Sequence, residues 1–443
     1  MKQIKLSFLI IVFIPTFLWF MADTLMPEPL TYFSFRTVFM QYSGVLAISL
    51  MSVIMVLALR PKFLEPYLDG MDKIYKLHKY LGITVFVIGI LHWWWGKGTK
   101  FMVGWGWLEK PVKSASTNTL GTIEAWFREQ RGFSESVGEW AFYIMVVLIV
   151  IAMIKKIPYH WFVRTHGFFM LIYLALVYHS IILTDINYWQ QPIGWLLIVL
   201  LFAGTASAFI TLSGNIGFNK KVKGKVVNLV EYPALHMLET TLVLEDGWQG
   251  HKAGQFAFVT TDKKEGAHPY TIASSWNLND KKLVFITKAL GDYTSRLKDE
   301  LKIGMKIMIE GPYGCFNFED KKSIHIYIGA GIGITPFIAR MKHLSSTPED
   351  KIVHLFHSTS KFDEAVINNL KEDAKNASVN LHLFVSSKDG RLNGNKIREA
   401  VPKWKNASVW FCGPAKFGEA LRDDFIAQGL NPKDFHQELF EMR

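Results

Sequence analysis

Six apolar runs in the first half of the chain restrict this protein to a membrane fold. Each run is near the length of about 20 residues that a helix needs to cross roughly 30 Å of hydrocarbon. We therefore expect residues 1–215 to form an α-helical bundle with six transmembrane spans. The runs cover about residues 4–21, 36–59, 74–95, 138–154, 160–183 and 189–212.

Basic residues beside the runs predict how the spans are oriented. Loops on the cytoplasmic side of a membrane carry an excess of Lys and Arg. The basic clusters all fall on one side, which places both termini in the cytoplasm. The membrane itself is expected to be a bacterial inner membrane. The clusters are Lys2/Lys5, Arg60/Lys62, Lys155/Lys156 and Lys220/Lys221.

The first run has the length and flanking charge of a secretion signal. No small-x-small cleavage site follows it, because Asp23, Pro27 and Pro29 come instead. We favour a retained first span, and a signal peptide stays open as the alternative.

The amino-acid composition indicates which kinds of binding partner to expect. The chain of 443 residues has 49 Lys and Arg against 38 Asp and Glu, a net charge of +11. Much of this excess flanks the apolar runs, which indicates attraction to an anionic lipid membrane. The sequence lacks a basic stripe with interleaved aromatic residues, so we expect no nucleic-acid partner. The two cysteines, Cys315 and Cys412, argue against a disulfide framework.

Four histidines within apolar sequence carry the strongest functional signal, because a histidine inside a membrane is costly unless it is paired. His78 and His92 lie fourteen residues apart on one predicted span, and His166 and His179 lie thirteen apart on another. The predicted topology puts one histidine of each span at each of two levels, about 20 Å apart along the helix axis. Two axial imidazoles saturate a haem iron, which suits electron transfer. We therefore expect two b-type haems, held by His78 with His166 and by His92 with His179.

The spacing of thirteen predicts an irregular helix. Thirteen residues miss the same helix face by about 140°, whereas fourteen nearly regain it. We expect a π-bulge, kink or strong tilt in the span 160–183, near Gly167 or Tyr173. Two alternatives stay open. The histidines can be unrelated members of the bundle, or they can bind a non-haem metal, which two nitrogens at each level disfavour.

The ends of the spans suggest further contacts. Arg36 and Arg164 are candidates to pair with haem propionates, although basic residues are common at membrane interfaces. The longest external segment, 96–137, is expected to contain a short interfacial helix near 121–131.

The second half of the chain has the pattern of a two-part soluble module. Short alternating strands with glycine-containing turns run from 216 to 318, which predicts a small antiparallel β-barrel. From 319 to 443, strands alternate with glycine-rich turns and helices, which predicts an α/β domain with a parallel sheet. The expected domains are therefore 1–215, 216–318 and 319–443.

A glycine-rich turn in this α/β domain predicts a nucleotide site. Glycines let the backbone approach a pyrophosphate, and a helix N-terminus presents free N–H groups to it. The order is not the strict G-x-G-x-x-G, but Cys412, Gly413 and Pro414 after a later strand strengthen the interpretation. The turn contains Gly329, Gly331, Gly333, Thr335 and Pro336.

Further motifs stand beside the glycine-rich turn and C-G-P at 412–414: H-P-Y-T at 268–271, the segment 288–294 and E-G-P-Y-G at 310–314. In their order along the chain, these features resemble the NADPH oxidase/ferric reductase family. In that family a six-helix, two-haem membrane domain precedes a flavoprotein module of the ferredoxin–NADP reductase type. The likeness covers about residues 36–443.

The resemblance implies an FAD site in the barrel domain. By analogy, His268 approaches the FAD phosphates, Tyr270 lies against the flavin or its ribityl chain, and Thr271 hydrogen-bonds near flavin N5. From its position, Thr294 is also expected to cap the helix after Gly291. The full implied set is His268, Pro269, Tyr270, Thr271, Lys288, Gly291 and Thr294.

The resemblance also implies where the nicotinamide meets the flavin. The segment 331–335 would hold the pyrophosphate of the nucleotide, and Cys412 with Gly413 would lie beside the nicotinamide. Cys412 would position the reactants and would not act as an acid or nucleophile. Phe440 would shield one face of the flavin, so Thr271, Cys412 and Phe440 are the expected contacts to the reacting rings.

The choice of nucleotide is predicted from the strand ends. Ser358, Lys361 and Arg391 follow the second and third strands of the α/β domain. Hydroxyl and cationic groups there suit a ribose 2′-phosphate, and no acidic residue ends the second strand to bind a free 2′-hydroxyl. This favours NADPH, with NADH open.

Together these expectations predict a membrane oxidoreductase. Electrons would pass from cytoplasmic NADPH through FAD and two haems to an acceptor outside, since a flavin converts a two-electron donor into one-electron steps. Eukaryotic oxidases of the family place a second histidine where this chain has Gly96, and the connection 184–188 is short. We therefore favour a general reductase of diffusible acceptors, such as ferric chelates, over a superoxide-generating oxidase.

Two further functions stay open. The chain could supply electrons to a periplasmic protein that docks on the segment 96–137. A proton channel or a purely structural haem protein would leave the flavin and nucleotide motifs without a use.

Overall fold

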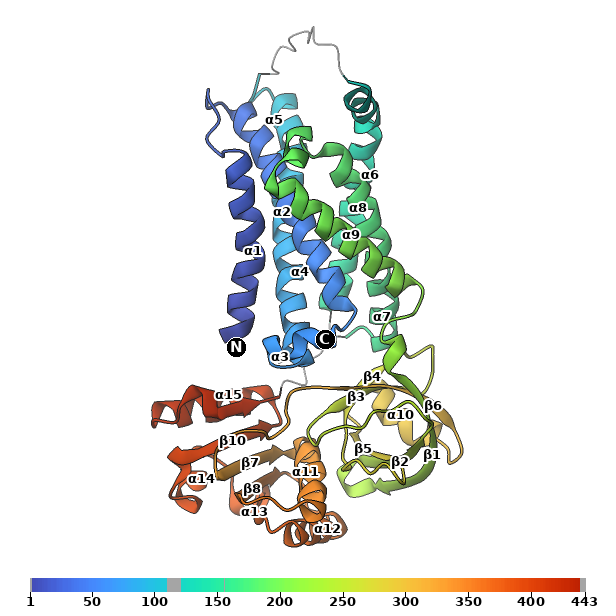
Figure 1. The fold of residues 1–443 in the computed structure, drawn as a ribbon, viewed down its shortest axis with the longest axis vertical. Coiled ribbons are helices and arrows are strands. Elements are labelled where there is room, and N and C mark those ends of the chain that lie inside the picture. Colours follow the sequence, from blue (N-terminus) through green and yellow to red (C-terminus); the bar gives the residue numbers. More distant parts are fainter. Residues whose placement is uncertain (1, 110–120, 155, 439–443) are drawn as a thin grey trace. The chain divides into compact units, whose positions relative to one another are not determined.

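The computed structural model describes residues 2–109, 121–154 and 156–438. The chain forms two compact units, whose helices and strands are labelled in Figure 1. The first comprises Met1–Pro61 and Lys73–Ile216, and the second comprises Lys62–Asp72 and Gly217–Arg443. The short segment 62–72 lies between two apolar runs in the sequence, yet it belongs to the same unit as the second half of the chain.

The first unit is a helical bundle that contains the six predicted spans. Six helical stretches are long and apolar enough to cross a membrane. In α2, 56% of the apolar stretch is buried, against 17–39% in the others, so α2 is the central helix. The helices are α1 (Lys2–Ala22), α2 (Tyr32–Ala58), α4 (Met71–Trp93), α5 (Thr99–Gly104), α6 (Thr122–Met153), α7 (Tyr159–Gly167), α8 (Phe169–Leu183) and α9 (Pro192–Leu212).

The spans that carry histidines depart from regular helix. α7 ends at Gly167 and α8 begins at Phe169, so the break predicted near Gly167 is confirmed. A π-helical turn (Trp94–Gly98) joins α4 to α5. The separate interfacial helix expected near 121–131 is wrong, because α6 continues from Thr122 to Met153. An ion pair between Arg131 and Glu135, one turn apart, is typical of such a continuous helix.

The barrel predicted in the second half is present. Its six strands are antiparallel, in the order β4-β3-β6-β1-β2-β5, and a bridge between Ile272 and Phe285 joins the two edges. Alternate residues of β2 are buried, as a strand with one face on a core requires. The elements are β1 (Lys221–Tyr232), β2 (Met237–Leu244), β3 (Phe256–Thr260), β4 (His268–Thr271), β5 (Lys282–Lys288), α10 (Asp292–Glu300) and β6 (Lys306–Tyr313); the segment 62–72 adds α3 (Glu65–Leu68).

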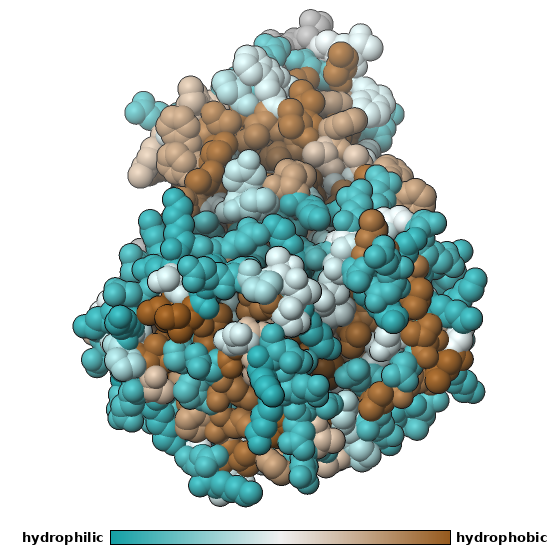
Figure 2. All heavy atoms as spheres, turned by 60° about the horizontal axis from the view of Figure 1, so that its bottom comes forward, coloured by the Kyte–Doolittle hydropathy of each residue, from teal (hydrophilic) through white to brown (hydrophobic). Residues whose placement is uncertain are grey.

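The remaining part of the second unit is the predicted α/β domain. Its parallel sheet has the order β11-β10-β7-β8-β9, with apolar clusters on both faces. Hydrophilic residues cover most of the face of the second unit that is visible in Figure 2, whereas hydrophobic residues dominate the visible part of the first unit. The elements are β7 (Ile324–Ala330), α11 (Thr335–Ser346), β8 (Ile352–Thr359), α12 (Glu364–Asn376), β9 (Asn380–Val385), α13 (Ser386–Asp389), α14 (Gly394–Ala400), β10 (Ala407–Cys412), α15 (Ala415–Ala427) and β11 (Phe435–Gln437).

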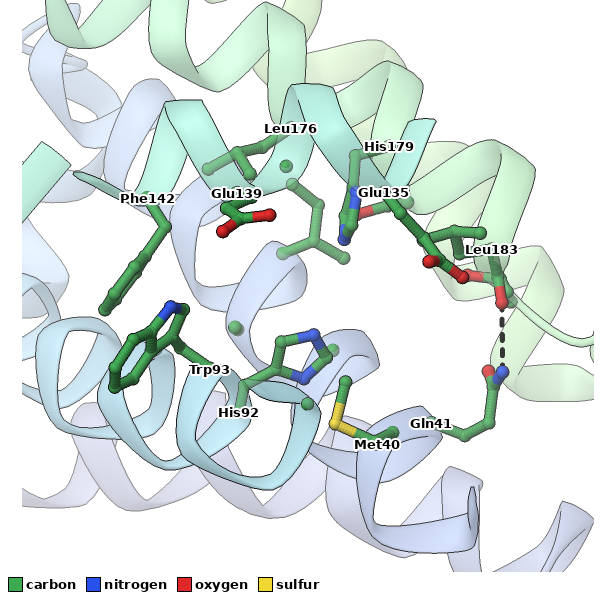
Figure 3. Close-up of a pocket in the computed structure, with 18 of the residues that line it drawn as sticks. Met40, Gln41, His92, Trp93, Glu135, Glu139, Phe142, Leu176, His179 and Leu183 are labelled. Carbon is green, nitrogen blue, oxygen red and sulfur yellow. Dashed lines mark hydrogen bonds between the residues drawn. The ribbon is translucent and has the colours of Figure 1, made fainter. Parts of the chain in front are cut away.

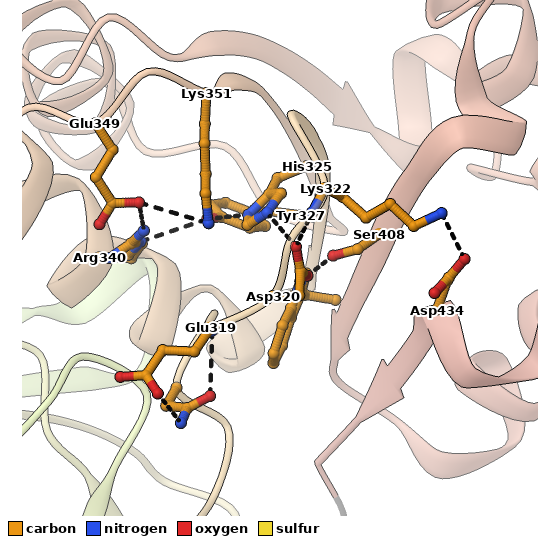
Figure 4. A network of polar contacts seen from close by, with 12 residues as sticks. Glu319, Asp320, Lys322, His325, Tyr327, Arg340, Glu349, Lys351, Ser408 and Asp434 are labelled. Carbon is orange, nitrogen blue, oxygen red and sulfur yellow. Dashed lines mark hydrogen bonds and ion pairs between the residues drawn. The ribbon is translucent and has the colours of Figure 1, made fainter.

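A polar network fastens the start of this sheet to the linker before it (Figure 4). The Nε2 atom of the buried His325 lies 3.0 Å from an oxygen of Asp320, and the N–H of Lys322 donates to the same carboxylate at 2.8 Å. Burial opposes ionisation of Asp320, but hydrogen bonds from His325, Ser408 and this N–H hold its pKa well below its usual range. The linker is therefore fixed to both β7 and β10.

Candidate functional site

His92 from α4 and His179 from α8 face each other in the first unit. Their ring centroids are 6.5 Å apart and their planes are 80° apart. The Nδ1 atom of His179 lies 2.8 Å from the carbonyl oxygen of Ser134, which can only accept, so Nδ1 carries the proton. Both spans therefore bring their histidines together, as the spacing predicted.

The tautomer of His92 follows from its neighbour. Its Nδ1 lies 2.9 Å from the hydroxyl of Ser43, and that hydroxyl donates to the carbonyl oxygen of Phe39 at 2.7 Å. The hydroxyl must then accept from His92 Nδ1. In both His92 and His179 the unprotonated nitrogen is therefore Nε2, the arrangement that orients a histidine as a metal ligand.

His78 from α4 and His166 from α7 form the other pair. Their ring centroids are 6.1 Å apart and their planes are 49° apart. His78 is hydrogen-bonded to the backbone of Ile54. Among the described residues, the buried Nδ1 of His166 has no hydrogen-bond partner. A buried imidazole of this kind gains from a ligand bond.

The spacing of both pairs fits a metal centred between two imidazoles. Two metal–nitrogen bonds of about 2 Å, together with the distance from each nitrogen to its ring centre, separate the centroids by roughly 6 Å. Among the described residues, no group of three or more His, Cys, Asp or Glu is placed to hold a metal ion. Two imidazoles at this spacing would fit an iron whose other ligands come from a porphyrin.

A cavity of about 410 Å³ contains the His92–His179 pair, and the two rings point toward each other across it (Figure 3). Two glycines make this space possible. A Cβ atom at Gly44 would lie 3.3 Å from His92 Cε1, and one at Gly138 would overlap the ring of His179. α6 therefore approaches His179 only because position 138 lacks a side chain, and a side chain at position 44 would make a tight contact with His92.

Charged residues line one side of this cavity. Lys97 pairs with Glu139 at 2.5 Å and Arg131 with Glu135 at 3.1 Å. The Arg131 and Glu135 side chains are 65% and 48% exposed, so the cavity reaches a solvent-accessible rim. Arg36 also lines the cavity, and its Nε donates to the carbonyl oxygen of Trp95 at 3.0 Å.

The other candidate for a propionate contact is placed differently. Arg164 lies over the ring of Trp161, 5.9 Å from its centroid. Of the two arginines, Arg36 is the one that lines the cavity of the His92–His179 pair.

In the second unit, the predicted flavin residues lie on adjacent strands. Thr271 is opposite Phe256 across β4 and β3, and Phe256 is opposite Tyr313 across β3 and β6. The His268 ring stacks on Tyr293 at 4.5 Å, and burial lowers the pKa of His268 to about 4. His268 is therefore neutral at pH 7 and suits a hydrogen bond to a phosphate.

The segment 288–294 forms the capped start of α10. Thr294 contributes to the cap from the third position of the helix, while Gly291 occupies the position before the first. The hydroxyl of Thr294 accepts the N–H groups of Leu290 and Gly291 at 3.0 Å. Lys288, at the end of β5, lines a small cavity together with Gly331 and Lys361.

The glycine-rich turn packs against the C-G-P segment. A Cβ atom at Gly333 would overlap the carbonyl of Cys412, and one at Gly413 would lie 2.8 Å from Ala330 Cβ. Burial raises the pKa of the Cys412 thiol well above its usual range, so the thiol stays protonated. The glycine-rich turn and the C-G-P segment, which follow different strands in the sequence, therefore lie in contact.

The remaining members of these motifs lie at helix starts. Thr335 and Pro336 open α11, and Pro414 precedes α15, as the strand–turn–helix pattern predicts. Gly329 lies within β7, and the Nδ1 atom of the buried His357 is 3.1 Å from its carbonyl oxygen.

The residues assigned to the ribose 2′-phosphate are only partly assembled. Lys361 lines the small cavity with Gly331, whereas Ser358, in β8, and Arg391, beyond α13, are outside its described lining. Asp363 also lines it and accepts the N–H of Val366 at 3.1 Å as the cap of α12. Phe440 lies outside the described residues.

Comparison with known protein families gives one match in each half of the chain. Residues 43–177 match the ferric reductase like transmembrane component, and residues 221–317 match an FAD-binding domain. The chain belongs to the NADPH oxidase/ferric reductase family.

The curated relatives of this chain are distant, with about a quarter of the matched residues identical. Respiratory burst oxidase homolog protein D of Arabidopsis thaliana is 26% identical over 282 residues, which are 52% of this chain and 30% of that protein. The flavohemoprotein of Rhizobium meliloti is 24% identical over 164 residues, 34% of this chain and 40% of that protein. The chain thus spans well under half of the length of these curated relatives.

The likeness between this chain and solved structures is weaker. The crystal structure of flavohemoglobin from Malassezia yamatoensis, with bound FAD and heme, covers 91% of this chain and 98% of its own, at 17% identity and a TM-score of 0.48. At this TM-score the likeness carries no functional conclusion.

The sequence alone did not identify several residues that complete the His92–His179 site and the small cavity of the α/β domain. Ser43, Ser134, Gly44 and Gly138 adjoin the His92–His179 pair from α2 and α6, which carry no histidine of the pairs. Asp363 could have been found, because an Asp before a helix is a frequent N-cap.

Proposed function

We propose that this chain is a transmembrane oxidoreductase that moves electrons from NAD(P)H through FAD and two bis-histidine b-type haems to an acceptor across the membrane. The observation that carries the proposal is the pairing of His78 with His166 and of His92 with His179 at 6.1 and 6.5 Å. Haem iron supplies one-electron chemistry, and flavin links it to a two-electron nucleotide donor.

The second unit would bind the flavin and the nucleotide. His268, Tyr270 and Thr271 of β4 would contact FAD, with Lys288, Gly291 and Thr294 near its pyrophosphate. Cys412 and Gly413 would position the nicotinamide, since they pack directly on the glycine-rich turn. The division at about residues 216 and 319, and a cytoplasmic location of this unit in a bacterial inner membrane, are parts of the proposal.

We favour a small diffusible acceptor, such as a ferric chelate, for the His92–His179 end. The charged rim of that cavity is exposed at Arg131 and Glu135. Gly96, which also lines the cavity, stands where the eukaryotic oxidases of the family have a histidine. A superoxide-generating oxidase is the second candidate, because dioxygen is also small enough to enter such a cavity.

The test is NADPH oxidation by the detergent-purified protein supplied with FAD. Reduction of ferric citrate at the same rate without oxygen is expected for the reductase. Cytochrome c reduction that superoxide dismutase abolishes would instead identify the oxidase. Turnover only after addition of a periplasmic extract would point to a protein acceptor, and absence of haem reduction by NADPH would refute the electron route itself.

A further inference from the structure

We infer that His357 binds a ribose hydroxyl of the nicotinamide nucleotide, which donates a hydrogen bond to the Nε2 atom of the imidazole. The hydroxyl that fits is the 3′-hydroxyl of the adenosine ribose, which NADH and NADPH share. This inference rests on the proposed function and adds to it a residue that recognises the nucleotide without discriminating between its two forms.

His357 lies near the carboxyl end of β8, the second strand of the parallel sheet in chain order. It is opposite Gly329 of β7, and its Nδ1 atom lies 3.1 Å from the carbonyl oxygen of that glycine. A carbonyl oxygen only accepts, so Nδ1 carries the proton and Nε2 is an acceptor. The sheet itself thus fixes the tautomer of this ring.

The Nε2 atom of His357 is available to a ligand. Among the residues that the structure describes, the imidazole is hydrogen-bonded to Gly329 through Nδ1, and Nε2 has no partner. The residue is 6% exposed, and burial lowers its pKa to about 4, so the ring is neutral at pH 7. A buried acceptor without a partner is costly, and a donor from a ligand removes that cost.

His357 lines a small cavity of about 40 Å³ beside the glycine-rich turn. Because one water needs about 10–15 Å³, this space admits a few atoms, such as one edge of a ribose. Lys288 and Lys361 line the same cavity. Gly331 also lines it, with φ +57°, and a Cβ atom there would meet nothing within 4 Å. Space for a ligand therefore continues beside the turn.

The polar groups of this cavity attract different parts of a nucleotide. The ammonium groups of Lys288 and Lys361 suit phosphate oxygens. A phosphate oxygen repels the lone pair on Nε2 of His357, so this atom requires a donor, and the donors next to the phosphates are the ribose hydroxyls. Folds of this type bind the ribose beyond the end of the second strand. The 2′-hydroxyl is phosphorylated in NADPH, so the 3′-hydroxyl is the donor that both nucleotides retain.

Asp363 is a competing acceptor in the same cavity. Its carboxylate accepts the N–H of Val366 at 3.1 Å as the cap of α12. The helix start thus already uses this carboxylate, whereas Nε2 of His357 has no other use in the fold. The experiment therefore includes a variant at each of these two positions.

The experiment measures nucleotide binding and needs no electron transfer. Isothermal titration calorimetry on the full-length protein in detergent, with oxidised FAD bound, gives the dissociation constants of NAD+ and NADP+. Each is compared with its analogue that lacks the 3′-hydroxyl of the adenosine ribose.

Four variants accompany the wild-type protein. His357→Asn keeps a donor for the Gly329 carbonyl but lacks Nε2, and His357→Gln brings an amide oxygen further along the side chain. Asp363→Asn keeps the oxygen that caps α12 and removes the charge. His343→Asn, at a partly exposed histidine of α11, is the matched control.

We expect the wild-type protein to bind each analogue about three- to tenfold more weakly than its parent nucleotide, as the loss of one hydrogen bond predicts. In His357→Asn the analogue and the parent should bind equally, and His357→Gln should restore part of the difference. Asp363→Asn and His343→Asn should keep the wild-type difference.

Equal binding of analogue and parent by the wild-type protein would overturn the inference, and this result does not depend on the folding of a variant. A difference that persists in folded His357→Asn, or that disappears in Asp363→Asn, would overturn it as well. Failure of the proposed function is distinguishable, because the wild-type protein would then bind neither nucleotide or would show no haem reduction by NADPH.

Discussion

His92 and His179 lie on different helices with their ring centroids 6.5 Å apart, and each presents Nε2 as its unprotonated nitrogen. The tautomers are set by a serine hydroxyl on α2 and a backbone carbonyl on α6. This pair is consequently oriented as a ligand set by groups that are not ligands themselves. The following predictions test that orientation and the chemistry proposed beyond it.

Gly138→Ala should remove or weaken the haem of the His92–His179 pair. The new methyl group would overlap the His179 ring, which must then rotate away from its ligand position. The expected result is haem loss toward half of the wild-type content and loss of external acceptor reduction. Gly82→Ala in α4 is the control, because its Cβ atom meets nothing within 4 Å. Full haem content and activity in Gly138→Ala would show that the ring position is not limiting.

Cys412→Ala should slow flavin reduction by NADPH about 10- to 100-fold, the scale of misplacing a reactant by a fraction of an ångström to one ångström. The thiol is buried and protonated, so it acts by shape against the glycine-rich turn. FAD content and the KM for NADPH should stay near wild type in steady-state assays. A large rise in KM without a change in the rate of flavin reduction would contradict this role.

Lys361→Ala should raise the KM for NADPH about tenfold and leave that for NADH nearly unchanged, since a charge-assisted hydrogen bond to a phosphate contributes about 1.5–3 kcal/mol. Lys361 lines the same small cavity as Gly331. Lys371→Ala, on the exposed surface of α12, is the control. Equal effects on both nucleotides would mean that Lys361 does not discriminate between them.

The second unit should lose stability in mild acid through His357. Burial lowers the pKa of His357 from 6.5 to about 4, so the unfolded chain binds a proton in a pH range where the folded chain does not. Stability is complete above pH 6.5 and falls as the pH decreases toward 4. The loss at pH 5 is about 2 kcal/mol, or roughly 4–8 °C in melting temperature.

His357→Asn tests this assignment, because an amide can still donate to the Gly329 carbonyl but does not titrate. Thermal unfolding followed by FAD fluorescence at pH 8 and pH 5 should show a smaller difference in melting temperature for this variant than for wild type. An identical pH dependence would assign the effect to other groups.

The sequence predicted those features that depend on local spacing. The six spans follow from the length of apolar runs, and the break near Gly167 follows from thirteen residues between His166 and His179. The barrel and the parallel sheet follow from alternation and from strand–turn–helix repeats. Each of these patterns lies within one element or between neighbouring ones.

Features that depend on contacts between distant segments were not predictable in this way. Gly138 makes room for His179 from another helix, and no local pattern marks it. The segment 62–72 reads as a short loop between two spans, yet Glu65 packs on Gly314, some 250 residues later in the chain. The continuous α6 was not predicted, because its first turns contain many polar residues and so do not belong to an apolar run.

The haem content per polypeptide, measured by pyridine haemochrome absorbance on purified protein of known concentration, tests whether both histidine pairs bind haem. We expect two b-type haems with low-spin spectra in the wild-type protein, and a single haem in each of the variants His92→Ala and His78→Ala. A single haem in the wild-type protein, or two haems that survive either substitution, would contradict this expectation.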